Sequence, residues 1–363
     1  MLRILLITLL VLHGLIHFMG LGKACNATAL KALSRPVGKG GAVAWTLCAL
    51  LLLSAAALVL GHCTRWWVPA LAGALLSQVL IVQHWRDARF GTIANVLILV
   101  AAIIGISAGS FRLEHREACD TALANARAIA GHRITESDLG SVPPPVQRFL
   151  RKAGVVGTVR PRSMRIQFAG EIRSIDGPWM PFTTTQVNTF DPPVRSFWMD
   201  ATMKGLPTKG WHNYNDGTAT MRIRVLGMIS VQDVSGPELD TAETVTWFND
   251  LCLFAPAALI DPRITWTPLD DHRSRATFSH GGITVHAELV FDGENRLVDF
   301  ISDDRYYIAP EGSMEHRRFR TPSSGHRIIN GLLLPGHGDA VWQFAEGPFT
   351  YGRFTVRSIV YDR

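Results

Sequence analysis

Two histidines, His13 and His17, stand four residues apart within the first long apolar stretch of the sequence. On a helix, this spacing places both imidazoles on the same face. Ionisable side chains in apolar segments of membrane length are rare, and each one suggests a function. One interpretation is a metal site formed by His13 and His17, because histidines four apart on a helix hold zinc in some proteases. The stretch between them, "GLI", lacks the glutamate that serves those proteases as general base.

A competing interpretation is that the two imidazoles are neutral and hydrogen-bonded to polar groups of neighbouring helices. Polar side chains often connect packed helices in membranes in this way. The sequence favours this interpretation, predicts no cofactor, and leaves a metal or redox role of His13 and His17 as an alternative. The candidate hydrogen-bond partners are Thr46, Ser54, Ser77, Gln78 and Asn95.

Two acidic clusters offer groups for general acid–base catalysis. The stretch "PLDDHRS" holds Asp270, Asp271 and His272, and "SDDRYY" begins at Ser302. Both stretches lie between strand-like runs, where acidic residues commonly form turns. The sequence contains no nucleophile elbow, phosphate-binding loop, dinucleotide fingerprint or Cys–His zinc pattern. An extracytoplasmic hydrolase using His272 therefore stays an alternative, and a non-catalytic protein is favoured.

Four apolar runs lie in the first 110 residues, which we expect to form a transmembrane four-helix domain. Each run approaches the roughly 20 residues that a helix needs to cross the hydrocarbon core of a bilayer. Short polar loops separate them. The runs are Leu2–Leu21, Val43–Leu60, Trp66–Val82 and Phe90–Gly109.

The basic residues predict the orientation of these helices. The first 110 residues carry eight basic residues and one acidic residue, whereas the remainder is nearly balanced. No basic surface for nucleic acid is therefore expected on the soluble part. An outside N-terminus makes the first and third loops cytoplasmic, which predicts a multi-pass protein of the cytoplasmic (inner) membrane with an extracytoplasmic C-terminal domain. The basic residues of those loops are Lys23, Lys31, Arg35, Lys39, Arg86 and Arg89.

The remaining chain changes from helical to strand periodicity. Residues 111–155 predict a helical stalk or linker, and residues 156–363 predict an antiparallel β-rich domain. In "GITVHAELVF", which ends at Phe291, apolar and polar residues alternate, as in strands with one buried face. A helix is expected from Pro237 to Pro256, and it is the obvious cover for the apolar face of the sheet. The predicted fold class is α+β, with a transmembrane bundle followed by a curved, mainly antiparallel half-barrel covered by a helix.

Several stretches of the β-rich part resemble a bacterial membrane-protein family of unknown function. They are "GPWMPF" from Gly177, "SGPELD" from Ser235, "WFNDLCLFAPAALI" from Trp247, "DRY" from Asp304 and "FTYGRFTVRSIVY" from Phe349. No functional residues of that family are established, so the resemblance implies none here. The order of strands and helix is also similar to periplasmic lipoprotein carriers, whose half-open barrels hold acyl chains under a helical lid. This second resemblance raises the expectation of an apolar ligand.

Aromatic residues are abundant in the predicted half-barrel. A curved sheet has more inner surface than one helix can fill, and an aromatic-lined concavity is suited to an apolar ligand. The function predicted from the sequence is therefore non-catalytic binding of a lipid or acyl chain at the membrane surface, with membrane lipids as partners and no nucleic acid. The candidate binding residues are Trp179, Phe182, Trp198, Trp247, Phe248 and Phe254.

Overall fold

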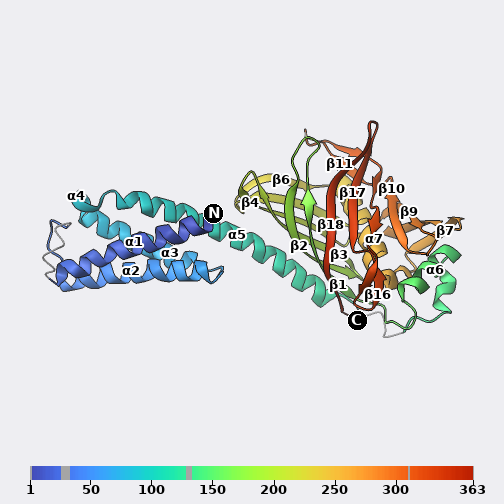
Figure 1. The fold of residues 1–363 in the computed structure, drawn as a ribbon, viewed down its shortest axis with the longest axis horizontal. Helices are drawn as coiled ribbons and strands as arrows, with labels where there is room; N and C mark the ends of the chain where they lie inside the picture. The colour runs from blue at the N-terminus through green and yellow to red at the C-terminus, as the bar shows by residue number, and fades with distance from the viewer. Residues whose placement is uncertain (1, 26–32, 128–132, 310, 363) are drawn as a thin grey trace. The chain divides into compact units, whose positions relative to one another are not determined.

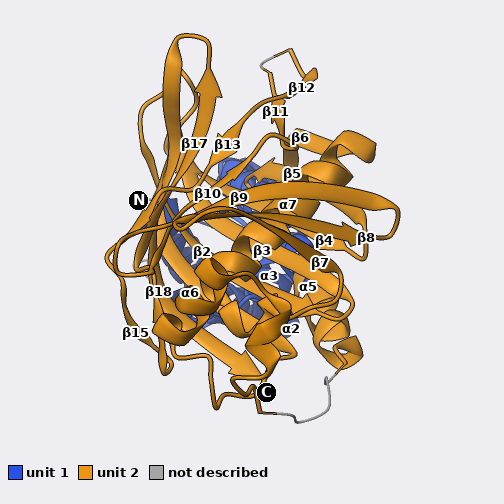
Figure 2. Ribbon diagram, turned by 90° about the vertical axis from the view of Figure 1, so that its right-hand side faces the viewer, with its two compact units in different colours: residues 1–113 blue, residues 114–363 orange. Residues whose placement is uncertain are grey.

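The computed structural model of this chain describes residues 2–25, 33–127, 133–309 and 311–362. The chain divides into two compact units, residues 1–113 and 114–363, which Figure 2 shows in different colours. The first unit is helical, and the second consists mainly of strands (Figure 1).

The helices of the first unit follow the four apolar runs of the sequence. Three of them, α1, α2 and α5, are long and apolar enough to cross a membrane, and α3 is a shorter apolar helix of 17 residues. Helix α5 continues without a break beyond the apolar run into the predicted stalk or linker, of which residues 128–132 lie outside the described part of the chain. The helices are α1 (Leu2–Ala24), α2 (Lys39–Leu60), α3 (Trp67–Gln83), the short α4 (Trp85–Ala88) and α5 (Gly91–Asn125).

Glycines allow close packing of the first two helices. A Cβ atom on Gly20 would lie 2.1 Å from Cγ of Trp45, and one on Gly14 would lie 3.3 Å from the carbonyl oxygen of Ala49. Small residues at such crossings let helix backbones approach, which is how apolar helices gain van der Waals contact where water does not drive their association.

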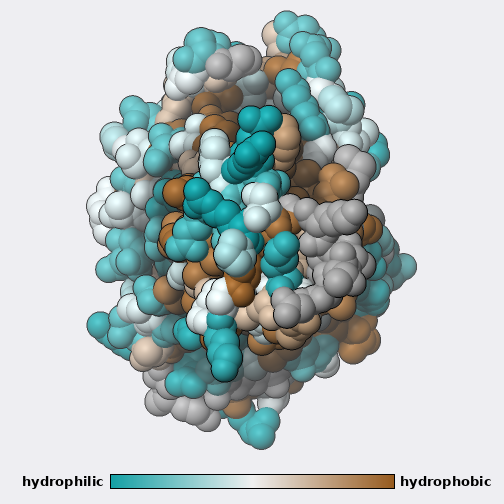
Figure 3. Space-filling model, turned by 90° about the vertical axis from the view of Figure 1, so that its left-hand side faces the viewer, coloured by the Kyte–Doolittle hydropathy of each residue, from teal (hydrophilic) through white to brown (hydrophobic). Residues whose placement is uncertain are grey.

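Polar side chains gather at the end of the helical unit that carries α4, and Figure 3 looks onto this end. The backbone N–H and hydroxyl of Ser34 both donate to Asp87 Oδ2, so the first and third loops meet there. Arg35 donates to the backbone oxygen of Gln83 at the same end. The loops that hold most of the basic residues therefore share one end of the bundle.

The second unit begins with the end of α5 and contains two further α-helices, two short 3-10 helices and eighteen strands among its described residues. The helices are η1 (Asp138–Ser141), α6 (Pro144–Ala153), α7 (Pro237–Phe254) and η2 (Pro256–Leu259). The first nine strands are β1 (Ser163–Ile172), β2 (Met180–Phe190), β3 (Pro193–Met203), β4 (Leu206–Asn215), β5 (Thr218–Val225), β6 (Ile229–Ser235), β7 (Ile264–Asp270), β8 (Arg273–His280) and β9 (Ile283–Phe291). The others are β10 (Leu297–Ser302), β11 (Tyr306–Ile308), β12 (Met314–His316), β13 (Phe319–Arg320), β14 (Ser323–Ser324), β15 (Arg327–Ile329), β16 (Leu332–Leu334), β17 (His337–Phe344) and β18 (Gly347–Asp362).

Most of these strands form one antiparallel sheet that curls into a half-barrel. Its order is β6-β5-β4-β3-β2-β1-β18-β17-β13-β10-β9-β8-β7, with β14 paired to β17. Strands β6 and β7 are its two edges, and the chain passes from one edge to the other through α7 (Figure 1). The α+β half-barrel with a covering helix, predicted from the sequence, is confirmed.

Helix α7 begins and ends where the sequence predicts. Pro237 occupies the first turn, where its missing N–H costs nothing, and Pro256 follows the last turn. The side chain of Asp240 accepts a hydrogen bond of 2.6 Å from the backbone N–H of Ala219 in β5, which holds the start of the helix against the sheet. Nearly every residue of α7 from Ala242 onward is buried. A helix buried on all sides must satisfy its polar side chains within the protein.

Gly170 in β1 is required by the close approach of β18. A Cβ atom at this position would lie 1.9 Å from the carbonyl oxygen of Arg353, whereas at Gly210 in β4 the nearest atom would lie 3.7 Å away. We expect Gly170→Ala to destabilise the half-barrel by about 1–3 kcal/mol, the usual cost of overpacking, and Gly210→Ala to have little effect. Thermal unfolding of the full chain in detergent, followed by tryptophan fluorescence, measures both. Equal melting temperatures for the two variants would contradict this account of the β1–β18 pairing.

Candidate ligand-binding site

A cavity lies between α7 and the concave face of the half-barrel. It contains about 880 Å³ of atom-free space, including the part that opens to solvent. The centres of water-sized molecules can occupy about 130 Å³ of this space, which describes a narrow cavity. The side chains that α7 contributes are on one face of the helix and change from polar near its start to apolar near its end: Glu243, Thr246, Asn249, Asp250, Leu253 and Phe254.

One wall of the cavity is apolar. Phe168 of β1 lies 5.5 Å from Phe254 of α7 and 5.8 Å from Phe354 of β18, measured between ring centroids. Phe197 and Met199 of β3 continue this wall, and both are buried. Such a surface gains free energy when it contacts a hydrocarbon instead of water.

A buried ionic network centred on Arg195 of β3 adjoins this wall, because the guanidinium carbon of Arg195 lies 4.7 Å from the ring centroid of Phe197. Its Nε donates to Asp250 Oδ2 at 2.7 Å, and its Nη1 donates to Glu243 Oε2 at 3.1 Å. Asp250 Oδ2 also accepts hydrogen bonds from the amides of Gln186 and Asn188 in β2. Both carboxylates are more than nine-tenths buried, and buried charges persist only when they are paired in this way.

The strand register explains how distant residues meet in this network. Arg195 lies opposite Asn188 in the β2–β3 ladder, and Phe197 lies opposite His212 in the β3–β4 ladder. Residues two apart on a strand share a face, so these side chains all point towards α7. His212 Nδ1 lies 3.3 Å from Glu243 Oε1, which places the imidazole in the cavity wall.

The ionic network controls the protonation of Glu243. Burial alone would raise the pKa of its carboxyl group, but the hydrogen bond from His212 and the positive charge of Arg195 outweigh burial. Together they lower the pKa from 4.5 to about 2. Glu243 is therefore ionised at neutral pH, and its charge is matched within the protein.

Asp339 of β17 also lines the cavity. Burial is the largest influence on its carboxyl group and raises the pKa above its ordinary value.

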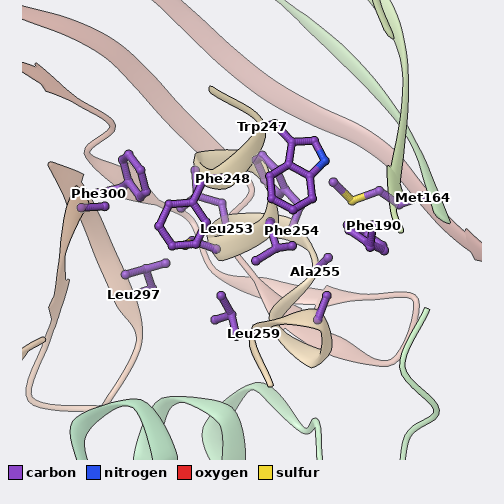
Figure 4. Packing of buried hydrophobic residues seen from close by; sticks show 14 of the residues in the cluster. Met164, Phe190, Trp247, Phe248, Leu253, Phe254, Ala255, Leu259, Leu297 and Phe300 are labelled. Atoms are coloured by element: carbon purple, nitrogen blue, oxygen red, sulfur yellow. The ribbon is translucent and has the colours of Figure 1, made fainter. Parts of the chain in front are cut away.

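The candidate aromatic residues of the sequence analysis lie in different places. Phe254 lines the cavity, whereas Phe182 is not part of the lining but lies on the same face of β2 as Gln186, 5.1 Å from Phe354. Trp247 and Phe248 lie in the core beside Phe278 and do not line the cavity. Figure 4 shows both side chains among other buried residues of the core.

The two remaining candidate tryptophans lie outside the cavity lining. Trp198 neighbours Phe197 on β3 and so projects from the other face of the sheet, where its ring lies 5.0 Å from that of His115. The ring of Trp179 is covered by the guanidinium groups of Arg173 and Arg353. Of the six candidates, the structure thus brings only Phe254 directly to the cavity.

Acidic residues of the two clusters bind backbone N–H groups and neighbouring arginines, whereas Arg305, which adjoins one cluster, lines the cavity. Asp270 accepts a hydrogen bond from the backbone N–H of His272 and pairs with Arg273, as expected for a turn between β7 and β8. Asp304 binds the backbone N–H of His286 in the neighbouring strand. Arg305, from the same "SDDRYY" stretch, is different because it lines the cavity.

The two histidines of α1 have hydrogen-bond partners on neighbouring helices. The Nε2 atoms of His13 and His17 lie 3.1 and 3.0 Å from Ser77 Oγ, and His13 Nε2 lies 2.8 Å from Asn95 Oδ1. Asn95 in turn donates to Gln78. Among the described residues, no three or more His, Cys, Asp or Glu side chains are grouped to hold a metal ion. A metal site at His13 and His17 stays a prediction.

Sequence reasoning missed the polar half of the cavity. Glu243 and Asp250 are seven residues apart, which places them on one face of a helix predicted to be buried. Acidic residues on a covered helix require buried partners, so the sequence itself indicates that Glu243 and Asp250 have such partners. The identity of those partners, Arg195 and His212, depends on strand pairing across about fifty residues and carries no local signature.

We expect Glu243→Gln to lower the free energy of unfolding by about 3–5 kcal/mol at pH 7, because it breaks a buried ion pair. The pKa of Glu243 is lower in the folded state, so its contribution is complete above about pH 4.5 and is lost as the pH falls towards 2. The melting temperature of the variant should therefore depend less on pH in this range. Glu171→Gln is the matched control, since it removes an exposed pair with Arg353 worth less than about 1 kcal/mol. Identical acid profiles for wild type and Glu243→Gln would refute the assignment.

Comparison with known proteins identifies one family to which the sequence belongs and several solved structures of similar fold. No curated protein matches the sequence. Among solved structures, a LolA superfamily protein from Nitrosomonas europaea is similar, with 9% identity and a TM-score of 0.33 over 60% of this chain and 93% of that chain. A DUF1329 family protein from Desulfovibrio piger has 12% identity and a TM-score of 0.31 over 61% and 93% of the two chains. A putative outer membrane lipoprotein-sorting protein domain from Vibrio parahaemolyticus has 6% identity and a TM-score of 0.29 over 55% and 84%. The model of a family of unknown function (DUF6544) matches residues 132–354, more than half of the sequence, and the chain belongs to this family.

Proposed function

We propose that this protein binds an apolar ligand, a lipid or an acyl chain, in the cavity between α7 and the half-barrel. The observation that carries the proposal is the continuous apolar wall formed by Phe168, Phe197, Met199, Phe254 and Phe354 within an open cavity. Among the residues that the structure describes, no group of side chains supports a reaction as directly as this wall supports binding.

The free energy available for such binding comes from removing hydrocarbon from water. Each buried methylene contributes about 0.8 kcal/mol, so about ten buried methylenes supply the roughly 8 kcal/mol of micromolar affinity before the cost of association is counted. The half-barrel retains an unfilled hollow because one helix, α7, is narrower than the concavity it covers. Its apolar end, Leu253 and Phe254, would contact the chain of the ligand, whereas its polar end, Glu243 and Asp250, would face the head of the ligand.

The helical unit suggests that the binding site acts at a membrane. Its three long apolar helices fit a bilayer in length and composition, and a unit inserted in the membrane would keep the half-barrel of the same chain close to membrane lipids. We propose that the ligand is exchanged with the membrane and that the protein acts there as a non-catalytic carrier or sensor of lipid.

We further propose that the protein resides in the cytoplasmic membrane with its half-barrel on the extracytoplasmic side. The first and third loops meet at one end of the bundle through Ser34 and Asp87, and their basic residues favour the cytoplasm. One of those residues, Lys31, lies outside the described part of the chain.

A C-terminal alkaline phosphatase fusion should be active in a bacterial host, and a C-terminal green fluorescent protein fusion should stay dark. Fusions placed after Asp87, in the third loop, are the matched control and should give the reverse result. A fluorescent C-terminal fusion with an inactive phosphatase would overturn the proposed orientation.

Filling the cavity should abolish ligand binding without unfolding the protein. Ala340 of β17 is buried and lines the cavity, so Ala340→Phe should occupy space that the ligand needs. We expect binding of a long-chain lipid to weaken by at least about tenfold, or about 1.4 kcal/mol. The melting temperature should change by less than about 3 °C, the equivalent of about 1 kcal/mol. Native mass spectrometry of the detergent-purified full chain measures co-purified lipid.

Ala169→Phe is the control for this experiment. Ala169 neighbours Phe168 on β1, so its side chain projects from the other face of the sheet, opposite Thr183 and Thr355. This variant should retain the lipid. If wild-type protein carries no lipid and Ala340→Phe is strongly destabilised, the cavity is too small to be a binding site and the proposal fails.

A further inference from the structure

Arg305 is a cation in the cavity wall that makes no direct contact with a carboxylate among the described residues. Its Nη1 donates to the hydroxyl of Tyr351 at 3.2 Å, and its guanidinium carbon lies 4.0 Å from the ring centroid of Phe319. Within the described residues, it forms no ion pair with a carboxylate, and its Nε has no hydrogen-bond partner. Stacking on an aromatic ring holds a guanidinium in place but leaves most of its in-plane N–H donors available.

The other arginine in the cavity wall is in the opposite situation. Arg195 is bonded to both Glu243 and Asp250, so its charge is matched and its donors are used. Two other arginines, Arg317 and Arg318 on the following segment of the chain, are also paired, Arg317 with Glu315 and Arg318 with Asp303. A half-buried guanidinium whose Nε has no hydrogen-bond partner has lost hydration that its protein contacts replace only in part, and an anion supplied by a ligand would offset this cost.

The nearby acidic residues do not bind Arg305 directly. Its charge helps to lower the pKa of Glu243, but the hydrogen bonds of that carboxylate go to Arg195 and His212. Asp339 also lines the cavity and forms no ion pair with Arg305 among the described residues. The cavity therefore offers a positive group at Arg305 and an apolar wall along Phe168 and Phe254.

We propose that the ligand is an amphiphile with an anionic head, a carboxylate or a phosphate, which binds to Arg305 and Tyr351. This inference rests on the proposed apolar-ligand function and adds the chemistry of the head group. The guanidinium donates N–H groups in the planar arrangement that carboxylate and phosphate oxygens accept. The hydroxyl of Tyr351 accepts a hydrogen bond from Arg305 and can donate its own proton to the same anion.

Binding of chain-matched amphiphiles to the full-length protein in nanodiscs tests this proposal. The probes are a sixteen-carbon fatty acid, the alcohol of the same length, the alkyl phosphate and the alkyl trimethylammonium. Wild-type protein should bind one or both anionic probes at least about tenfold more tightly than the alcohol, a difference of about 1.4 kcal/mol. The two anionic arms distinguish a carboxylate from a phosphate head.

The variants separate charge from structure. Arg305→Gln should lose the preference for the anion and keep the affinity for the alcohol, whereas Arg305→Lys should retain part of the preference. Tyr351→Phe should reduce the preference without removing it. Arg318→Gln is the control because it removes an exposed arginine that pairs with Asp303 outside the cavity.

The outcomes are distinguishable. If no probe binds to wild-type protein, the proposed apolar-ligand function fails. If all probes bind equally, or the cationic probe binds best, and Arg305→Gln changes nothing, apolar binding stands and the anionic head group is refuted. If Arg305→Gln fails to fold, unchanged preferences in Arg305→Lys and Tyr351→Phe would refute the assignment in the same way.

Discussion

The rest of the half-barrel depends on the burial of α7 between the two free edges of its sheet. The helix connects edge strands β6 and β7 and lies in the concavity, so it is surrounded by protein on nearly all sides. Its apolar residues supply much of the core, with Trp247 and Phe248 packed against Phe278. Its polar residues cannot reach bulk water, and each therefore requires a partner on the surrounding strands.

This requirement accounts for the division of the cavity into two walls. Arg195 satisfies Glu243 and Asp250 at the polar end of α7, and the two amides of β2 complete the coordination of Asp250. Towards the other end, Leu253 and Phe254 face phenylalanines from β1 and β18. The ionic network fixes the helix in the concavity, and the space left beside the apolar end of the helix is what a ligand could use. Such a site has separate surfaces for the chain and for the head of an amphiphile.

The same physical rule operates in the helical unit. His13, His17, Ser77 and Asn95 form a connected hydrogen-bond network among apolar helices. Polar groups in an apolar environment are stabilised by satisfying one another, and the network favours one packing arrangement of the helices. Both units thus place a small polar cluster inside an apolar interior.

The sequence by itself determined the elements and their order. Hydrophobic periodicity located the apolar helices, the strands and α7, and the prolines at 237 and 256 marked the limits of that helix, because these signals are local. The prediction that this helix covers the apolar face of the sheet is confirmed by its burial against the strands. Only the tertiary structure decided that one face of the helix lines a cavity, and that Arg195, His212 and Arg305 stand opposite it. These partners come from separate strands whose register is set by pairing over long stretches of chain, and no local pattern in the sequence records which side chains such pairing brings together.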